Sequence, residues 1–172
     1  MKAWKYMILV GGLAGIIGFF VPFARAQHEA AKIDQGVSAF QLVKGIDKKE
    51  FVAEAEQLKI NKADAERAAE DLEKGLKDAG TYALIAYAPA ALLAVIGIFG
   101  LVLNRTGRLA GVLAVLAGGA SAGIWALLSA AAGQAQSGGP TVSLAIGAHL
   151  LLVAGILGGV AGLGAVVSPD RG

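Results

Sequence analysis

The sequence contains no cysteine, and aromatic residues make up only 6% of it. The absence of cysteine excludes disulfide bonds and any metal or redox site that depends on thiolates. The few basic residues outside one polar stretch form no patch that would suit nucleic acid. No legible motif combines a nucleophile with a base, paired acids or a metal-binding cluster. We therefore expect a non-enzymatic protein without cofactor or metal.

Charge is also missing from four long apolar runs, although 56% of the chain is hydrophobic. Each run has at least 18 residues without Asp, Glu, Lys or Arg, which is enough to cross a hydrocarbon core of about 30 Å. The runs are Tyr6–Phe23, Tyr82–Leu103, Leu109–Ala132 and Val142–Val167. The sequence therefore predicts an all-α integral membrane protein with a four-helix transmembrane bundle.

The charged residues gather in the stretch between the first and second runs. Residues 27–80 hold 21 of the 28 Asp, Glu, Lys and Arg side chains. This divides the chain into three parts. Residues 1–26 form the N-terminus and the first span, residues 27–80 form a polar segment, and residues 81–172 form the other three spans with short connectors.

Basic residues flank the runs on one predicted side of the membrane. Lys2 and Lys5 precede the first run, Arg105 and Arg108 lie between the second and third, and Arg171 follows the fourth. The positive-inside rule then predicts cytoplasmic N- and C-termini. Long segments cross membranes largely regardless of charge, so residues 27–80 are expected to be extracytoplasmic.

The N-terminus has a second interpretation. Met1–Ala26 combines a basic start, an apolar core, Pro22 and an Ala-x-Ala ending, which is typical of a secretory signal peptide. Cleavage after Ala26 would leave three spans. The apolar run is longer than a usual signal core, which favours an uncleaved anchor.

The polar segment is predicted to form an extracytoplasmic helical hairpin. A capping-box spacing at Asp47–Glu50 precedes a first apolar stripe that includes Phe51 and Leu58. A second stripe includes Leu72 and Leu76, with a break near residues 59–61 and an end near residues 75–80. Residues 38–44 suit either a helical turn or a short strand.

These stripes are thin and rich in alanine, and fewer than about 60 residues make a marginal core. They either pack on each other or form a face for another membrane protein or a copy of the same chain. The candidate partner face is Phe51, Leu58, Leu72 and Leu76.

Small residues recur at helical spacing in the runs, and such spacing lets helix backbones approach closely in lipid. We expect the following glycines to pack helices together: Gly11, Gly15, Gly18, Gly119, Gly123, Gly155, Gly159 and Gly162.

His149 is the ionisable residue that lies within a run. At about 1.5 Å per residue, Tyr87 and Trp125 fall at a similar depth and Ser129 lies nearer the surface, so the four are predicted to form an intramembrane polar cluster. A hydrogen bond from His149 to Tyr87 or Ser129 would hold the bundle together. Ligand contact or proton transfer is the alternative. Pro89 is expected to kink the second run.

The four-span layout with a large first outer segment resembles claudin-like tetraspan proteins in topology. The chain lacks their paired cysteines and their Trp-Gly-Leu-Trp signature, so no residue is carried over. The expected function is a membrane scaffold, assembly or accessory subunit that contacts a partner or copies of itself, within membrane lipid. The alternative is a transporter or channel component for a small molecule, ion or lipid, with a site near His149 and Pro89.

Overall fold

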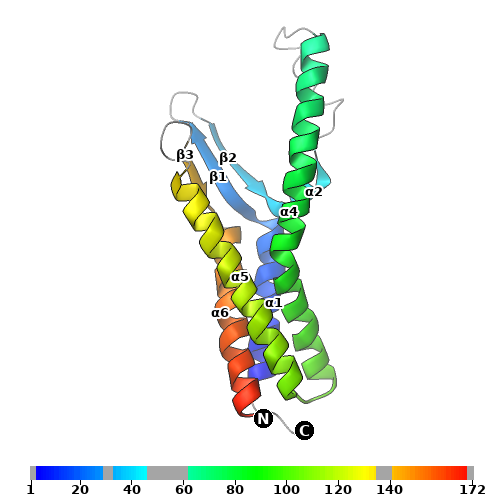
Figure 1. The fold of residues 1–172 in the computed structure, drawn as a ribbon, viewed down its shortest axis with the longest axis vertical. Coiled ribbons are helices and arrows are strands. Elements are labelled where there is room, and N and C mark those ends of the chain that lie inside the picture. The colour runs from blue at the N-terminus through cyan, green and yellow to red at the C-terminus, as the bar shows by residue number, and fades with distance from the viewer. Residues whose placement is uncertain (1–2, 29–32, 46–61, 135–140, 170–172) are drawn as a thin grey trace.

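The computed structural model describes residues 3–28, 33–45, 62–134 and 141–169. Four helices form a bundle (Figure 1): α1 (Trp4–Phe20), α4 (Lys62–Val102), α5 (Arg108–Gln134) and α6 (Ile146–Val167). A short helix and three strands lie at one end of it. α1 begins and α6 ends at the opposite end (Figure 1), which we call the inner end. The end with the strands is called the outer end.

Three helical stretches are long and apolar enough to cross a membrane. They are Lys77–Val102, Arg108–Gly133 and Ile146–Val167. α1 is equally apolar but has 17 residues, about 26 Å at about 1.5 Å per residue, which is less than a core of about 30 Å. The chain is thus mostly helical, with three helices long and apolar enough to cross a membrane and a shorter fourth one beside them.

The bundle has small residues inside and large apolar residues outside. Its two buried clusters are rich in alanine and include Ile8 and Leu93 in one and Leu151 in the other. Large side chains face outward, and Leu109 is 81% exposed. This distribution suits a lipid environment, where close backbone contact holds helices together and hydrocarbon covers the surface.

α1 ends where proline follows. Pro22 disfavours helical backbone at the preceding residue, and Val21 is extended. The chain continues as β1 (Pro22–His28), which pairs antiparallel with both β2 (Ile33–Ser38) and β3 (Thr141–Leu144). The sheet order is β2-β1-β3, with Ala24 opposite Leu144 in β3 and Val37 in β2.

The sheet corrects the all-α prediction. Pro22 and Phe23 were counted in the first run and Val142 in the fourth, but they belong to strands, and α6 begins at Ile146. The strands are short, and pairing between β1 and β3 joins distant parts of the chain, so no local period revealed them. The Ala145 N–H donates to the Phe23 carbonyl at 2.8 Å, which continues this pairing to the start of α6.

Of residues 38–44, Ser38 ends β2 and residues 39–44 form a helix. α2 (Ala39–Lys44) begins with a capping box, in which the Gln41 N–H donates to Ser38 Oγ and the Ser38 N–H donates to Gln41 Oε1. It ends at Gly45, whose φ of 75° favours glycine.

α4 is one unbroken helix of 41 residues. It passes through Gly75 and Gly80, where the second helix of the predicted hairpin was expected to end, so that part of the prediction is wrong. A single glycine costs a helix about 1 kcal/mol relative to alanine and does not end it. Gly80 instead admits α2, since a Cβ there would lie 2.8 Å from the Leu42 carbonyl oxygen. The first predicted hairpin helix lies outside the described residues.

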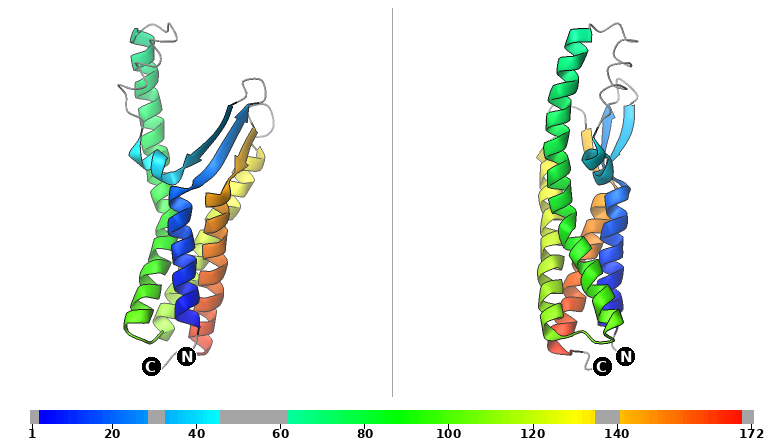
Figure 2. Two further views of the ribbon diagram at one scale, coloured as in Figure 1. Left: turned by 180° about the vertical axis from the view of Figure 1, so that it is seen from behind. Right: turned by 90° about the vertical axis from the view of Figure 1, so that its right-hand side faces the viewer.

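α4 also crosses the domain boundary predicted at residues 80 and 81, and the boundary predicted at residues 26 and 27 falls within β1. Figure 2 shows α4 extending well beyond the other bundle helices, with the sheet leaning away from it.

Candidate functional site

An aromatic cluster joins the helices where the bundle meets the sheet. The Phe19 ring makes edge contacts with Phe20, Phe40 and Tyr87, at centroid distances of 5.3, 6.3 and 5.5 Å. The Tyr87 hydroxyl donates to the Gly147 carbonyl at 3.3 Å. The cluster therefore links α1, α2 and α4 to the first turn of α6.

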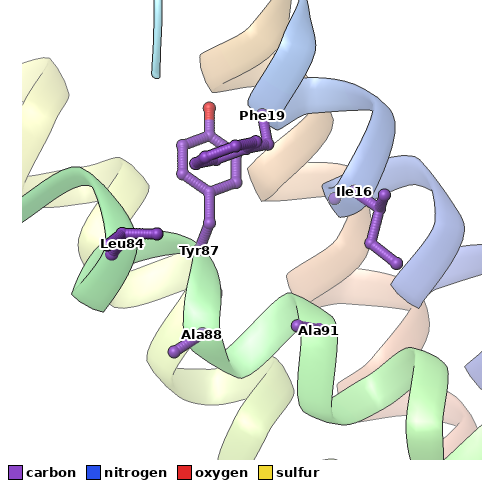
Figure 3. A pocket seen from close by; sticks show the side chains of 7 residues that line it. Ile16, Phe19, Leu84, Tyr87, Ala88 and Ala91 are labelled. Carbon is purple, nitrogen blue, oxygen red and sulfur yellow. The ribbon is translucent and has the colours of Figure 1, made fainter. Parts of the chain in front are cut away.

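A pocket of about 430 Å³ lies beside this cluster, between α1 and α4 (Figure 3). The Phe19 and Tyr87 rings lie against each other at one side of it, and Ala88 and Ala91 line it from α4. Its remaining lining residues are Gly15, Ile16 and Leu84. None of these side chains is charged, so the pocket suits hydrocarbon and offers no acid, base or nucleophile.

The four residues of the predicted polar cluster make separate contacts. The Trp125 and His149 rings meet edge-on with centroids 6.4 Å apart. His149 is exposed, and its Nδ1 lies 3.0 Å from the Ala145 carbonyl, to which the Nδ1-protonated tautomer donates. Ser129 Oγ donates to the Trp125 carbonyl at 2.9 Å, within the same helix. Tyr87 is engaged with Gly147 instead, so the histidine bonds to neither hydroxyl.

The residues of the transporter hypothesis lie on different helices. Pro89 is inside α4 and His149 is in the first turns of α6. Neither lines the pocket between α1 and α4. The structure therefore does not bring them to a common site.

Glycines of α1 admit both neighbouring helices at close range. A Cβ on Gly15 would lie 2.2 Å from Ala90 Cβ of α4, and one on Gly12 would meet the Ala94 backbone equally closely. On the other side, a Cβ on Gly11 would meet Ala154 of α6, and Gly18 approaches the Gly147 carbonyl. α1 is thus inserted between α4 and α6 with no room for side chains at these points.

The glycines of α5 and α6 divide into two sets. Gly155 and Gly162 lie in the contact, where added Cβ atoms would meet the α5 backbone at 2.7 Å. Added Cβ atoms on Gly119, Gly123 and Gly159 would meet nothing within 4 Å. Gly118 also lies in the contact, since its Cβ would lie 2.4 Å from the Gly159 nitrogen. Neighbouring residues lie about 100° apart around a helix, and glycines occur at adjacent positions here. The spacing of small residues therefore could not tell which face of α5 or α6 lies in the contact.

Lys5 makes a contact that sequence reasoning missed. It is only 1% exposed, and its Nζ donates to Asn104 Oδ1 in the connector between α4 and α5. Asn104 has a φ of 49°, a left-handed conformation that asparagine tolerates better than most residues. Nothing in the sequence indicated this pair, because the two residues lie 99 positions apart.

The predicted partner face is described in part. Leu72 and Leu76 lie in α4, just before the span-length stretch that starts at Lys77. Phe51 and Leu58 lie outside the described residues. Figures 1 and 2 show no other described helix or strand beside the outer turns of α4.

Among the described residues, no group of three or more His, Asp or Glu side chains is placed to hold a metal ion. The site thus consists of an apolar pocket, an aromatic cluster and a projecting helix. No family model, no curated protein and no solved structure matches the chain.

Proposed function

We propose that the protein is a non-enzymatic membrane scaffold or accessory subunit, which presents the outer part of α4 to another membrane protein or to a second copy of itself. The observation that carries this proposal is the continuity of α4 from Lys62 to Val102. Its span-length part starts at Lys77, so residues 62–76 extend the helix by about 22 Å at about 1.5 Å per residue.

The sequence of this extension supports a contact face. Ala65, Ala68, Ala69, Leu72 and Leu76 recur at intervals of three and four residues, which places them along one side of a helix. Amphipathic helices bury such a stripe against another element. No other described helix or strand lies beside these turns (Figure 2).

We further propose four spans, with α1 as the fourth. α1 packs between α4 and α6 through glycines, and cleavage after Ala26 would remove it and cut β1. These contacts support the uncleaved anchor. Flanking residues at helix ends, or local thinning of the bilayer, accommodate a short hydrophobic helix.

The proposed orientation has cytoplasmic termini and an extracytoplasmic sheet. Lys5, Arg105 and Arg108 all belong to helix starts or the connector at the inner end, in agreement with the positive-inside rule. Arg25 lies in β1 at the outer end, just before residues 27–80, the long segment that the rule leaves free to translocate.

The contact face is tested by substitution in the full chain. Leu72→Glu places a charge on the stripe and is expected to abolish cross-linking to the partner or second copy in native membranes. Lys74→Glu is the matched control, because a residue two positions away lies about 200° around the helix. Membrane extraction behaviour should be unchanged in both variants. Persistence of cross-linking in Leu72→Glu would show that the stripe is an internal seam.

A further inference from the structure

A second apolar groove lies between α4 and α5, in the inner half of the bundle. Its volume is about 360 Å³, within the range of about 300–1,000 Å³ that is usual for small-ligand sites. It is lined by Leu92, Val95, Phe99, Leu103, Ala110 and Leu113. Arg105 and Gly107, in the connector between the two helices, complete the lining at its inner end.

The groove results from the way α5 packs. The close-contact glycines of α5, Gly111 and Gly118, both face α6. Between α4 and α5 large side chains hold the helices further apart. Phe99 of α4 is 61% exposed there, and Leu113 of α5 is 46% exposed. A lipid-facing groove with such walls is filled by hydrocarbon.

The inner end of the groove is positively charged. Arg105 is exposed there, and Arg108 is exposed at the start of α5. No Asp or Glu occurs in the sequence between Asp78 and Asp170, so α5, the connector and the part of α4 inward of Asp78 carry no carboxylate that could pair with these arginines. Lys5, a further described cation at this end, donates a hydrogen bond to Asn104.

We propose that this groove binds an anionic phospholipid, with one acyl chain along the apolar walls and the phosphate against Arg105 and Arg108. An arginine guanidinium binds phosphate oxygens in a bidentate manner, and anionic lipids of the cytoplasmic leaflet attract basic residues beside a span. The outer pocket is larger but has no charged lining residue, so it lacks the headgroup contact. This inference rests on the proposed membrane location and orientation, but it is independent of the scaffold role.

The test is native mass spectrometry of the full chain in detergent, with phosphatidylglycerol and phosphatidylcholine of identical acyl chains added in equal amounts. We expect phosphatidylglycerol to be retained about thirtyfold more, the ratio that corresponds to two basic residues beside an anionic headgroup. In the double variant Arg105→Gln/Arg108→Gln the preference should disappear while some lipid of both kinds is still retained.

The position of the lipid is tested by filling the groove. A Cβ on Gly107 would meet nothing within 4 Å, so Gly107→Leu is expected to fold and to reduce the retention of both lipids. Gly119→Leu is the matched control, since its Cβ also meets nothing within 4 Å, and it should retain lipid as the wild type does.

Equal retention of the two lipids by the wild type would overturn the proposal, as would a preference that survives in the arginine variant. If Gly107→Leu and Gly119→Leu lost the same amount of retained lipid, the lipid would lie elsewhere, which would also overturn the proposal. Purification of the chain from the soluble fraction without detergent would instead contradict the membrane location itself, so the two failures are distinguishable.

Discussion

The two faces of α5 use glycine in opposite ways. On the face toward α6, Gly111 and Gly118 let two backbones meet, and a Cβ on either would lie within 3 Å of the α6 backbone. On the face of α5 that points away from α6, Gly119 and Gly123 have open space beside them. A glycine in a membrane helix therefore allows close packing only where a Cβ at that position would point toward a neighbouring helix.

The largest effect should come from Gly118 compared with Gly119. Gly118→Leu forces a side chain to within 2.4 Å of the Gly159 nitrogen, so we expect it to cost more than about 4 kcal/mol of folding free energy. Gly119→Leu should change the free energy by no more than about 0.5 kcal/mol. Thermal unfolding in detergent, followed by circular dichroism, measures both. Similar melting of the two variants would remove the distinction between the faces.

The same comparison extends to α6 with a somewhat smaller effect. Gly155→Leu meets the Ala122 nitrogen at 2.7 Å and should cost about 3 kcal/mol, whereas Gly159→Leu points its Cβ into open space and should be near neutral. The same unfolding experiment applies. If Gly159→Leu were the more damaging change, the helix would have to be rotated from the observed position.

The hydrogen bond between Lys5 and Asn104 at the inner end is expected to stabilise the packed helices further. Asn104→Gly keeps the left-handed backbone but removes the hydrogen bond of the buried Lys5 ammonium, which should cost about 2 kcal/mol. Lys5→Met in the same chain should recover most of that loss, because both polar partners are then gone. Additive destabilisation in the double variant would show that the two side chains act independently.

The smallest expected effect concerns Tyr87. Tyr87→Phe keeps the ring in the aromatic cluster but removes the hydrogen bond from the Tyr87 hydroxyl to the Gly147 carbonyl, which should cost about 1 kcal/mol. Tyr82→Phe, at a position that is 73% exposed, is the control and should have no measurable effect. Identical unfolding of both variants would mean that the hydroxyl does not link α4 to α6.

The span-length helices could be predicted because the length of a charge-free apolar run alone indicates them. A charge-free run of about 20 residues suffices to cross the core. The runs starting at Tyr82 and Leu109 coincide with the span-length stretches Lys77–Val102 of α4 and Arg108–Gly133 of α5 to within a few residues at each end. The strands could not be predicted in this way. Ala24 and Leu144 pair across most of the chain, and β1 and β3 each overlap an end of an apolar run, which concealed them.

The continuity of α4 and the choice of packing face were also beyond the sequence pattern. The glycine at position 80 suggested a helix end, whereas it serves the close approach of α2, a tertiary contact. Gly118 and Gly119 are adjacent residues of the same type, and only the position of α6 distinguishes them. The rings of Trp125 and His149 do meet, as similar depth suggested, but depth alone did not reveal which hydrogen bonds form.

The most direct test of the scaffold proposal is the intact mass of the assembly that the chain forms. The chain, tagged at its C-terminus, would be extracted gently from native membranes, purified by the tag and weighed as an intact complex, with Leu72→Glu in parallel. The proposal predicts a defined complex, either of several copies or with another protein, that is lost in Leu72→Glu. Recovery of the wild type as a lone monomer would contradict it.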